Sequence, residues 1–240
     1  MHDGGWGRWP QPSLYSVVQG MIITSLERQQ RRRRVNVFVD GRFALAVGLD
    51  LAAERGLHTG MAVTEAELRS LQTAEAGQKA YEAGLRLLTY RPRSEREMRQ
   101  RLARRGFEAR LIGETVARLR RLGYLDDDAF ARYWTESRDQ LSPRAGRLIR
   151  RELRLKGIDS EIAAEASAAV SDEDAAYRAA AKRVRVLAGL DFARFRERLG
   201  GFLIRRGFSY EVTRHVLERC WQEWGQGHPG EDEGPENASS

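Results

Sequence analysis

From residue 76 onward, apolar residues recur at the three- and four-residue spacing that predicts amphipathic helices. Three glycines divide this region at intervals of 51 and 50 residues: Gly106, Gly157 and Gly207. Each follows an apolar pair at helical spacing. The residues eight and four positions before the glycines are Met98 and Leu102, Ile149 and Leu153, and Leu199 and Leu203. A third marker follows each glycine, as a stripe at +5, +9 and +13: Leu111, Thr115 and Leu119, then Ile162, Ala166 and Val170, then Val212, Val216 and Cys220.

The glycines are predicted to end helices. A basic residue precedes each one, where a helix C-terminus favours positive charge. Glycine then enters the left-handed conformation without a Cβ penalty, and a large apolar residue returns the chain to the core. Those flanking pairs are Arg105 and Phe107, Lys156 and Ile158, and Arg206 and Phe208. The pattern predicts three tandem three-helix units of about fifty residues, a period typical of repeat arrays.

Polar residues mark the helix starts. First helices are expected near 77–90, 126–140 and 172–188. Ser94 and Glu97 form a capping-box pattern, and Ser142 before Pro143 predicts a cap with proline at the first helical position. Ser171 and the run 126–128 are expected to start first helices. Three adjacent aspartates in that run also suggest metal binding, but no further ligand is suitably spaced, so an N-cap with first-turn acids is the preferred interpretation.

The N-terminal segment has a different period. Two β-prone runs in 35–47 flank Asp40 and Gly41, which predicts a hairpin with a type I′ turn. The run 21–26 is expected to add a third strand, and 64–71 begins with a Thr-x-x-Glu pattern that predicts a short helix. The predicted organisation is a leader 1–20, a β-hairpin module 21–75, helical repeats 76–124, 125–171 and 172–224, and an acidic tail 225–240. The two terminal segments are expected to be disordered, and Met21 is a candidate for the natural start.

The composition favours an acidic partner. The chain has 240 residues, 31% of them charged, with a formal net charge of +7. Such an excess is typical of proteins that bind nucleic acid. No stretch approaches the roughly twenty apolar residues of a membrane span, and no signal-peptide pattern begins the chain. A single cysteine, Cys220, excludes an internal disulfide. We expect a cytoplasmic protein that does not bind membranes.

The most specific chemical pattern is a series of arginines on the second helix of the middle unit. Arg144, Arg147, Arg150, Arg151 and Arg154 fall within an arc of about 120°, away from Ile149 and Leu153, at about 100° per residue. A solvated surface face is one interpretation. The other is a binding surface, since guanidinium groups form paired hydrogen bonds with phosphate and carboxylate.

No pattern indicates catalysis or a cofactor. The sequence lacks a phosphate-binding glycine loop, zinc spacing and a nucleophile elbow. Phe130, Tyr133 and Trp134 are able to stack on bases, but their helical spacing favours core packing. Helix-turn-helix reading of bases by each unit is disfavoured, because 159–170 contains no Lys or Arg. We expect neither an enzyme nor a metal site.

Three stretches together resemble the RecX family of bacterial recombination regulators: RPRSEREMRQRLARRGF (91–107), LRRLGYLDDDAFARYW (119–134) and GRLIRRELRLKGI (146–158). The segment 35–51 also resembles the N-terminal part of many members. The resemblance covers roughly 21–222 and implies a mainly α fold: three tandem three-helix repeats in an elongated, curved array, after a small N-terminal module with a β-hairpin. It implies a monomeric, non-enzymatic partner of the RecA-type recombinase filament on single-stranded DNA, one that modulates filament growth, strand exchange and ATP hydrolysis.

The family supplies no catalytic residues, so the candidate binding residues come from helix geometry and charge. They are Arg104, Arg105, Arg144, Arg147, Arg150, Arg151, Arg154, Lys156, Arg205 and Arg206. The alternative function is a general nucleic-acid-binding helical repeat protein that acts without a recombinase.

Overall fold

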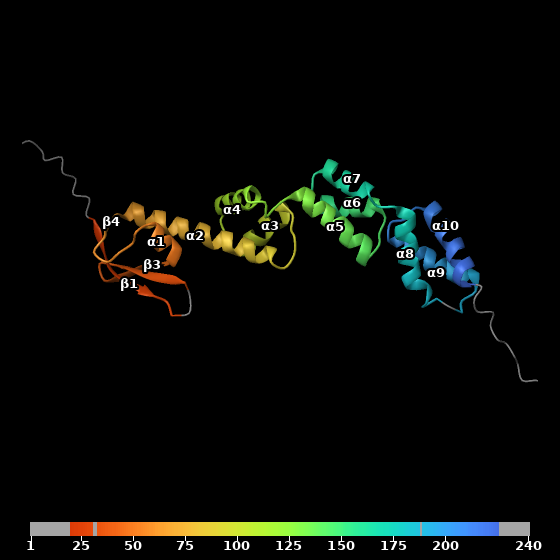
Figure 1. Cartoon of the computed structure of the whole chain (residues 1–240), viewed down its shortest axis with the longest axis horizontal. Coiled ribbons are helices and arrows are strands. Elements are labelled where there is room, and N and C mark those ends of the chain that lie inside the picture. Colours follow the sequence, from red (N-terminus) through yellow and green to blue (C-terminus); the bar gives the residue numbers. More distant parts are fainter. Residues whose placement is uncertain (1–19, 31–32, 188, 226–240) are drawn as a thin grey trace, which may run out of the picture. The chain divides into compact units, whose positions relative to one another are not determined.

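The computed structural model describes residues 20–30, 33–187 and 189–225 (Figure 1). The chain forms two compact units that divide between Lys79 and Ala80. The predicted leader lies outside the described residues except for Gly20, and the predicted acidic tail except for Gly225. The other predicted domain boundaries remain predictions.

The first unit contains a four-stranded antiparallel sheet in the order β3-β2-β1-β4. The strands are β1 (Met21–Arg28), β2 (Arg34–Val39), β3 (Arg42–Gly48) and β4 (Ala62–Val63). The predicted hairpin and third strand are therefore confirmed. Asp40 and Gly41 join β2 to β3 with φ angles of 49° and 77°, the two positive values that a type I′ turn requires. The sequence patterns did not predict β4 or the short helix α1 (Leu49–Glu54).

A long helix, α2 (Glu65–Leu88), replaces two predicted helices. The sequence predicted one helix at 64–71 and another at 77–90, and this separation was wrong. Buried residues continue at helical spacing through the segment between them: Leu68, Leu71, Glu75, Ala80, Ala83 and Leu87. Gly77 lowers helix stability by about 1 kcal/mol relative to alanine. This cost is too small to end a helix that buries one face along its length.

A capping box fixes the start of α2, and a buried carboxylate further along the helix joins it to the sheet. Glu67 N donates to Thr64 Oγ1, and Thr64 N donates back to Glu67 Oε2, as the pattern predicted. Glu75 is only 5% exposed. Its carboxylate accepts from Gly48 N at 2.9 Å and forms an ion pair with Arg34 at 2.5 Å, so the buried charge is compensated on the sheet side of the helix.

The second unit contains the three predicted three-helix repeats. The last part of α2 packs with α3 and α4, and the next two repeats follow in order (Figure 1). The helices are α3 (Glu95–Ala103), α4 (Ala109–Arg121), α5 (Asp127–Leu141), α6 (Gly146–Leu155), α7 (Ser160–Ala168), α8 (Asp172–Val184), α9 (Phe192–Arg205) and α10 (Tyr210–Cys220), and a π-helical turn, Trp221–Gly225, ends the described chain.

Each repeat has its own apolar core, and the predicted markers lie in it. The six apolar residues that precede the three glycines have no exposed surface: Met98, Leu102, Ile149, Leu153, Leu199 and Leu203. The later stripe is buried in the first repeat, and Val216 and Cys220 are buried in the third. In the middle repeat Ile162, Ala166 and Val170 are only partly buried, because Ala163 and Ser167 occupy the inner face of α7.

The predicted glycine corners are confirmed. Gly106, Gly157 and Gly207 have φ angles of 82°, 87° and 90°. In each corner the residue after the glycine donates its backbone N–H to the carbonyl of the buried leucine four positions before the glycine. This bond and the left-handed glycine define the Schellman motif, which ends the second helix of every repeat in the same way.

Most of the predicted helix caps are confirmed. The side chains of Ser94, Asp126 and Ser171 accept hydrogen bonds from backbone N–H groups three residues later. The predicted reciprocal bond from Glu97 to the backbone of Ser94 is replaced. The Glu97 carboxylate instead binds Arg91 and Arg93, and Arg93 is nearly buried, so its charge requires a partner.

The predicted cap at Ser142 is wrong. Helix α6 begins at Gly146 with Ala145 in the N-cap position, while Ser142 ends α5. The turn between these helices instead forms hydrogen bonds with the next repeat: Arg206 donates to Ser142 Oγ at 3.1 Å and to Pro143 O at 2.9 Å.

Consecutive repeats are joined by an equivalent backbone connection. Ser94 Oγ donates to Lys156 O at 2.7 Å, and Ala145 N donates to Arg206 O at 3.1 Å. In both cases the residue just before the second helix of one repeat binds a carbonyl at the end of the second helix of the next. That carbonyl is one of the groups that a helix leaves unpaired at its C-terminus.

Aspartates at the start of the first helices complete the connection. Glu95 N donates to Asp127 Oδ1 at 2.9 Å, and Gly146 N donates to Asp172 Oδ1 at 2.8 Å. Each carboxylate therefore satisfies a free N–H at the N-terminus of the preceding repeat's second helix, where negative charge is favourable. The contacts between repeats thus use polar groups at helix ends. The spacing of apolar residues in the sequence does not predict such contacts.

Candidate nucleic-acid interface

Four arginines of α6 form an exposed basic surface on the middle repeat. Arg147, Arg150, Arg151 and Arg154, together with Leu155, line an open hollow of about 480 Å³. None of the four forms an ion pair with a carboxylate of the described residues. We call these four residues the α6 arginine surface.

The burial of α6 sets the direction of these side chains. Ile149 and Leu153 have no exposed surface and fix the opposite face of the helix in the core. Arg150 Nε donates to Ser167 Oγ at 3.3 Å, and Arg147 Nε donates to the carbonyl oxygen of Gly207. These contacts hold part of each guanidinium and leave its remaining N–H groups available to an anion, since a guanidinium carries five donors.

Arg144 does not belong to this surface. The sequence placed it on the same helix, but it lies before the N-cap of α6. Its guanidinium binds Glu152, whose carboxylate also accepts from Arg138 Nε at 2.9 Å and from Trp134 Nε1 at 3.0 Å. Glu152 is largely buried, so its charge requires partners, and it forms ion pairs with the two nearest guanidinium groups.

Lys156 also takes part in internal contacts. Its ammonium lies 3.9 Å from the centroid of the Trp134 ring, a cation–π geometry. Burial lowers the pKa of Lys156; the carboxylate of Glu97 opposes this effect and the positive charge of Arg91 adds to it. Arg206 is similar: it contacts the Phe202 ring at 4.6 Å, and its pKa is lowered by burial and by the neighbouring Arg144.

Three further candidates are exposed on other helices. Arg104 and Arg105 follow the end of α3, and Arg205 ends α9. The structure therefore gathers four of the ten predicted residues into one surface. Three lie at separate exposed helix ends, and the remaining three, Arg144, Lys156 and Arg206, lie in contacts within and between repeats.

Comparisons with known proteins identify the family. Four family models match consecutive parts of the chain: the regulatory protein RecX N-terminal domain over 21–64, and the first, second and third three-helix domains of RecX over 80–119, 126–166 and 171–217. A curated regulatory protein RecX from Bacillus licheniformis is 30% identical over 200 residues, which are 82% of this chain and 76% of the relative. The chain belongs to the RecX family.

Other RecX proteins support the same assignment. A regulatory protein RecX from Listeria monocytogenes serotype 4a is 28% identical over 207 residues, 85% of this chain and 77% of the relative. A crystal structure of regulatory protein RecX covers 82% of this chain and 99% of its own, with a TM-score of 0.63 and 24% identity. A crystal structure of RecX from Lactobacillus salivarius covers 61% of this chain and 97% of its own, with a TM-score of 0.52 and 23% identity. These structural likenesses concern the fold.

Within the described ranges, no three or more potential metal-binding side chains of His, Cys, Asp or Glu lie close together. Across the same part of this RecX chain, no helix has the length and apolar character needed to cross a membrane. Cys220 is fully buried, as predicted. Core packing is confirmed for Phe130, which is only 2% exposed, and Trp134 is partly buried against the same core. For Tyr133 the expectation of core packing was wrong, because its side chain is exposed.

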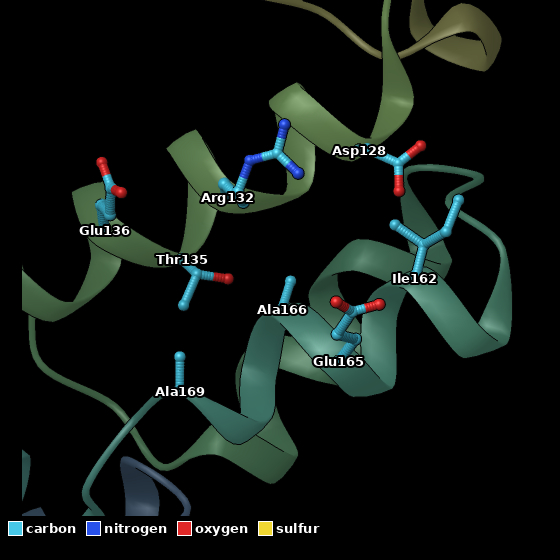
Figure 2. A pocket seen from close by; sticks show the side chains of 8 residues that line it. All are labelled: Asp128, Arg132, Thr135, Glu136, Ile162, Glu165, Ala166 and Ala169. Atoms are coloured by element: carbon cyan, nitrogen blue, oxygen red, sulfur yellow. The ribbon is translucent and has the colours of Figure 1, made fainter.

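The sequence patterns missed a cleft between α5 and α7 of the middle repeat (Figure 2). Thr135 lies on its inner wall and is 5% exposed. The available sequence signal was the spacing of four between Ala131 and Thr135, which places a hydroxyl on the apolar face of α5.

Proposed function

We propose that this RecX chain binds a RecA-type recombinase filament on single-stranded DNA and modulates it, mainly by inhibition. The affected steps are filament assembly, ATP hydrolysis and strand exchange, so the chain regulates DNA repair and recombination. The family supports a regulatory role, because its curated relatives are named regulatory protein RecX. The identification of the recombinase filament as the partner rests on the family resemblance.

The α6 arginine surface is the observation that carries the proposal. Four guanidinium groups that lack acidic partners among the described residues offer paired hydrogen bonds to successive phosphates. A solvated surface face alone does not require four arginines: exposed arginines elsewhere in the chain commonly pair with a carboxylate one helical turn away, as Arg110 pairs with Glu114 and Arg214 with Glu218.

Binding at this surface explains modulation without chemistry of the chain's own. A protein that occupies the groove of a filament favours or opposes the addition and loss of subunits through its differential affinity for the two states. Its effect is then a shift in an assembly equilibrium. The chain needs no nucleophile, metal or cofactor for such a role.

A comparison of two substrates tests the proposal. The affinity of the chain is measured for bare single-stranded DNA and for the same DNA coated with recombinase, at one fixed salt concentration, because salt alone changes such affinities. We expect tighter binding to the coated strand. Equal or weaker binding to the coated strand contradicts the proposal and supports the second candidate, a general nucleic-acid-binding repeat protein, which the same arginines favour.

A further inference from the structure

The middle repeat has a second, chemically different hollow between α5 and α7. Its volume is about 280 Å³. Its lining residues are Asp128, Arg132, Thr135, Glu136, Ile162, Glu165, Ala166 and Ala169 (Figure 2). The first four come from α5; Ile162, Glu165 and Ala166 come from α7, and Ala169 is the residue that caps its end. The cleft shares no lining residue with the α6 arginine surface.

A buried hydroxyl without a partner lies at the wall of this cleft. Thr135 is 5% exposed, and its Oγ1 has no hydrogen-bond partner among the described residues. Figure 2 shows this oxygen directed into the space between α5 and α7. A buried threonine on a helix ordinarily bonds the carbonyl four residues earlier, so a hydroxyl turned away from its own helix leaves an acceptor available to a ligand.

The cleft is negatively charged. Three carboxylates and one guanidinium line it, which leaves an excess of two negative charges. None of Asp128, Arg132, Glu136 and Glu165 forms an ion pair with another described residue. The acids are exposed: Glu165 lies on the α7 side of the space, Asp128 at its end beside Ile162, and Glu136 extends to the outer side of α5 (Figure 2). Such a surface repels phosphate and attracts a cation.

The remaining lining is small and apolar. Ile162 and Ala166 are partly buried and pack against the core of the repeat, and Ala169 lies at the other end of the cleft from Ile162. The volume lies at the lower limit of small-molecule pockets, which span about 300–1,000 Å³. A long basic side chain suits this combination, because its aliphatic stem covers apolar surface while its charged end reaches polar groups.

We propose that the α5–α7 cleft binds a lysine or arginine side chain of a basic segment on a protein partner. The stem lies over Ala166 and Ala169, Thr135 Oγ1 accepts a hydrogen bond from the cationic group, and Glu165 neutralises its charge, while Asp128 and Glu136 add to the negative potential of the cleft. The inference goes beyond the proposed function, because it assigns a second surface that selects a basic protein, whereas the α6 arginine surface selects a polyanion.

Nuclear magnetic resonance of the full chain tests this site directly. The probe is a capped peptide of alternating lysine and alanine, and the observed signals are the methyl groups of Thr135, Ala166 and Ala169. We expect these signals to shift as the peptide is added. We expect no such shift with the same peptide after acetylation of its lysines, which removes the positive charge and keeps the stem.

Three variants make the test specific. Thr135→Val removes the hydroxyl at nearly constant shape, and we expect peptide binding to weaken about tenfold, the loss typical of a hydrogen bond to a charged group. The pair Glu136→Gln and Glu165→Gln is expected to weaken it at least as much. Glu114→Gln is the matched control, since this exposed acid pairs with Arg110 outside the cleft, and binding should not change.

Several outcomes overturn the inference. Binding that survives both cleft variants places the peptide elsewhere, and equal shifts with the acetylated peptide exclude recognition of charge. Shifts caused by a single-stranded oligonucleotide assign the cleft to nucleic acid. If the methyl signals move with the chain's own concentration, and sedimentation shows self-association, then the occupant is a second copy.

Discussion

Gly157 lies directly against Arg96 of the preceding repeat. A Cβ atom on Gly157 would come within 2.3 Å of Arg96 Cδ and 2.5 Å of Arg96 Cβ. The equivalent Gly207 shows a milder version, with 3.0 Å to Leu148 Cβ, whereas Gly106 has open space around it. In the second and third repeats, the glycine that ends the second helix therefore also leaves room for side chains of the preceding repeat.

This relationship predicts unequal effects of the same substitution. Gly106→Ala and Gly157→Ala both place a side chain at positive φ, which costs about 1–2 kcal/mol. Gly157→Ala also overlaps the stem of Arg96, whose Cβ cannot swing away, and overpacking adds about 1–3 kcal/mol. We expect urea unfolding to show the larger loss for Gly157→Ala. Equal losses would mean that the two repeats separate without cost.

Reversing the charge of the α6 arginine surface should abolish regulation. Glutamate at Arg147, Arg150 and Arg154 is expected to remove inhibition of recombinase ATP hydrolysis while circular dichroism shows unchanged helicity, because these three side chains are exposed and lie outside the core. A matched control changes net charge equally at exposed positions on three other helices: Arg110, Arg194 and Arg214. Full inhibition by the first variant excludes this surface.

The salt dependence of binding should count the arginines that contact phosphate. On a single strand each contact contributes about 0.7 to the slope of log K against log salt, so four contacts give about 3. Arg150→Ala together with Arg154→Ala should lower that slope by about 1.4. Binding titrations at several salt concentrations measure it, with Arg214→Ala as the control. An unchanged slope contradicts direct contact.

The carboxylate of Glu152 should contribute more to the free energy of unfolding than an exposed acid does. Glu152→Ala leaves Arg138 and Arg144 half-buried and without their shared acid, so we expect a loss of about 1–3 kcal/mol in the free energy of unfolding. Glu114→Ala breaks an exposed pair and should cost less than about 0.5 kcal/mol. Similar midpoints for the two variants in urea unfolding would show that Glu152 is replaceable.

Cys220 should be unreactive in the folded chain. Burial raises the pKa of its thiol to about 12, with the charge of Glu223 adding to the effect, so little reactive thiolate forms at neutral pH. Reaction with a chromogenic disulfide reagent is expected to be slow until denaturant is added. Rapid labelling of the folded protein contradicts this burial.

The same shift predicts a pH dependence of stability. The folded pKa lies above the ordinary value of 9.0, so the folded state binds the proton more tightly, and this contribution is complete below 9.0. It is lost as the pH rises from 9.0 toward about 12. Cys220→Ala should lack this component of the alkaline decline in unfolding midpoint. Identical declines would show that other groups cause it.

The sequence by itself determined the repeated unit. Residues such as Leu102 and Met98 lie within one helix, and Gly106 ends that helix through its own backbone, so their period and spacing predict both burial and corner. The hairpin turn at Asp40 and Gly41 is local in the same sense. Most helix caps were predictable because a cap joins residues three positions apart.

Only the tertiary structure decided which charges are free. Five arginines near α6 looked alike in sequence, yet Arg144 binds Glu152 and joins Trp134 and Arg138 in one network, because the fold brings α5 beside α6. In the same way, the ammonium of Lys156 lies over the ring of Trp134 and is not free at the surface. The continuous course of α2 and the cleft at Thr135 likewise depend on residues distant in sequence. Periodicity reports which face of a helix is buried, whereas the partner of each charge depends on which faces meet.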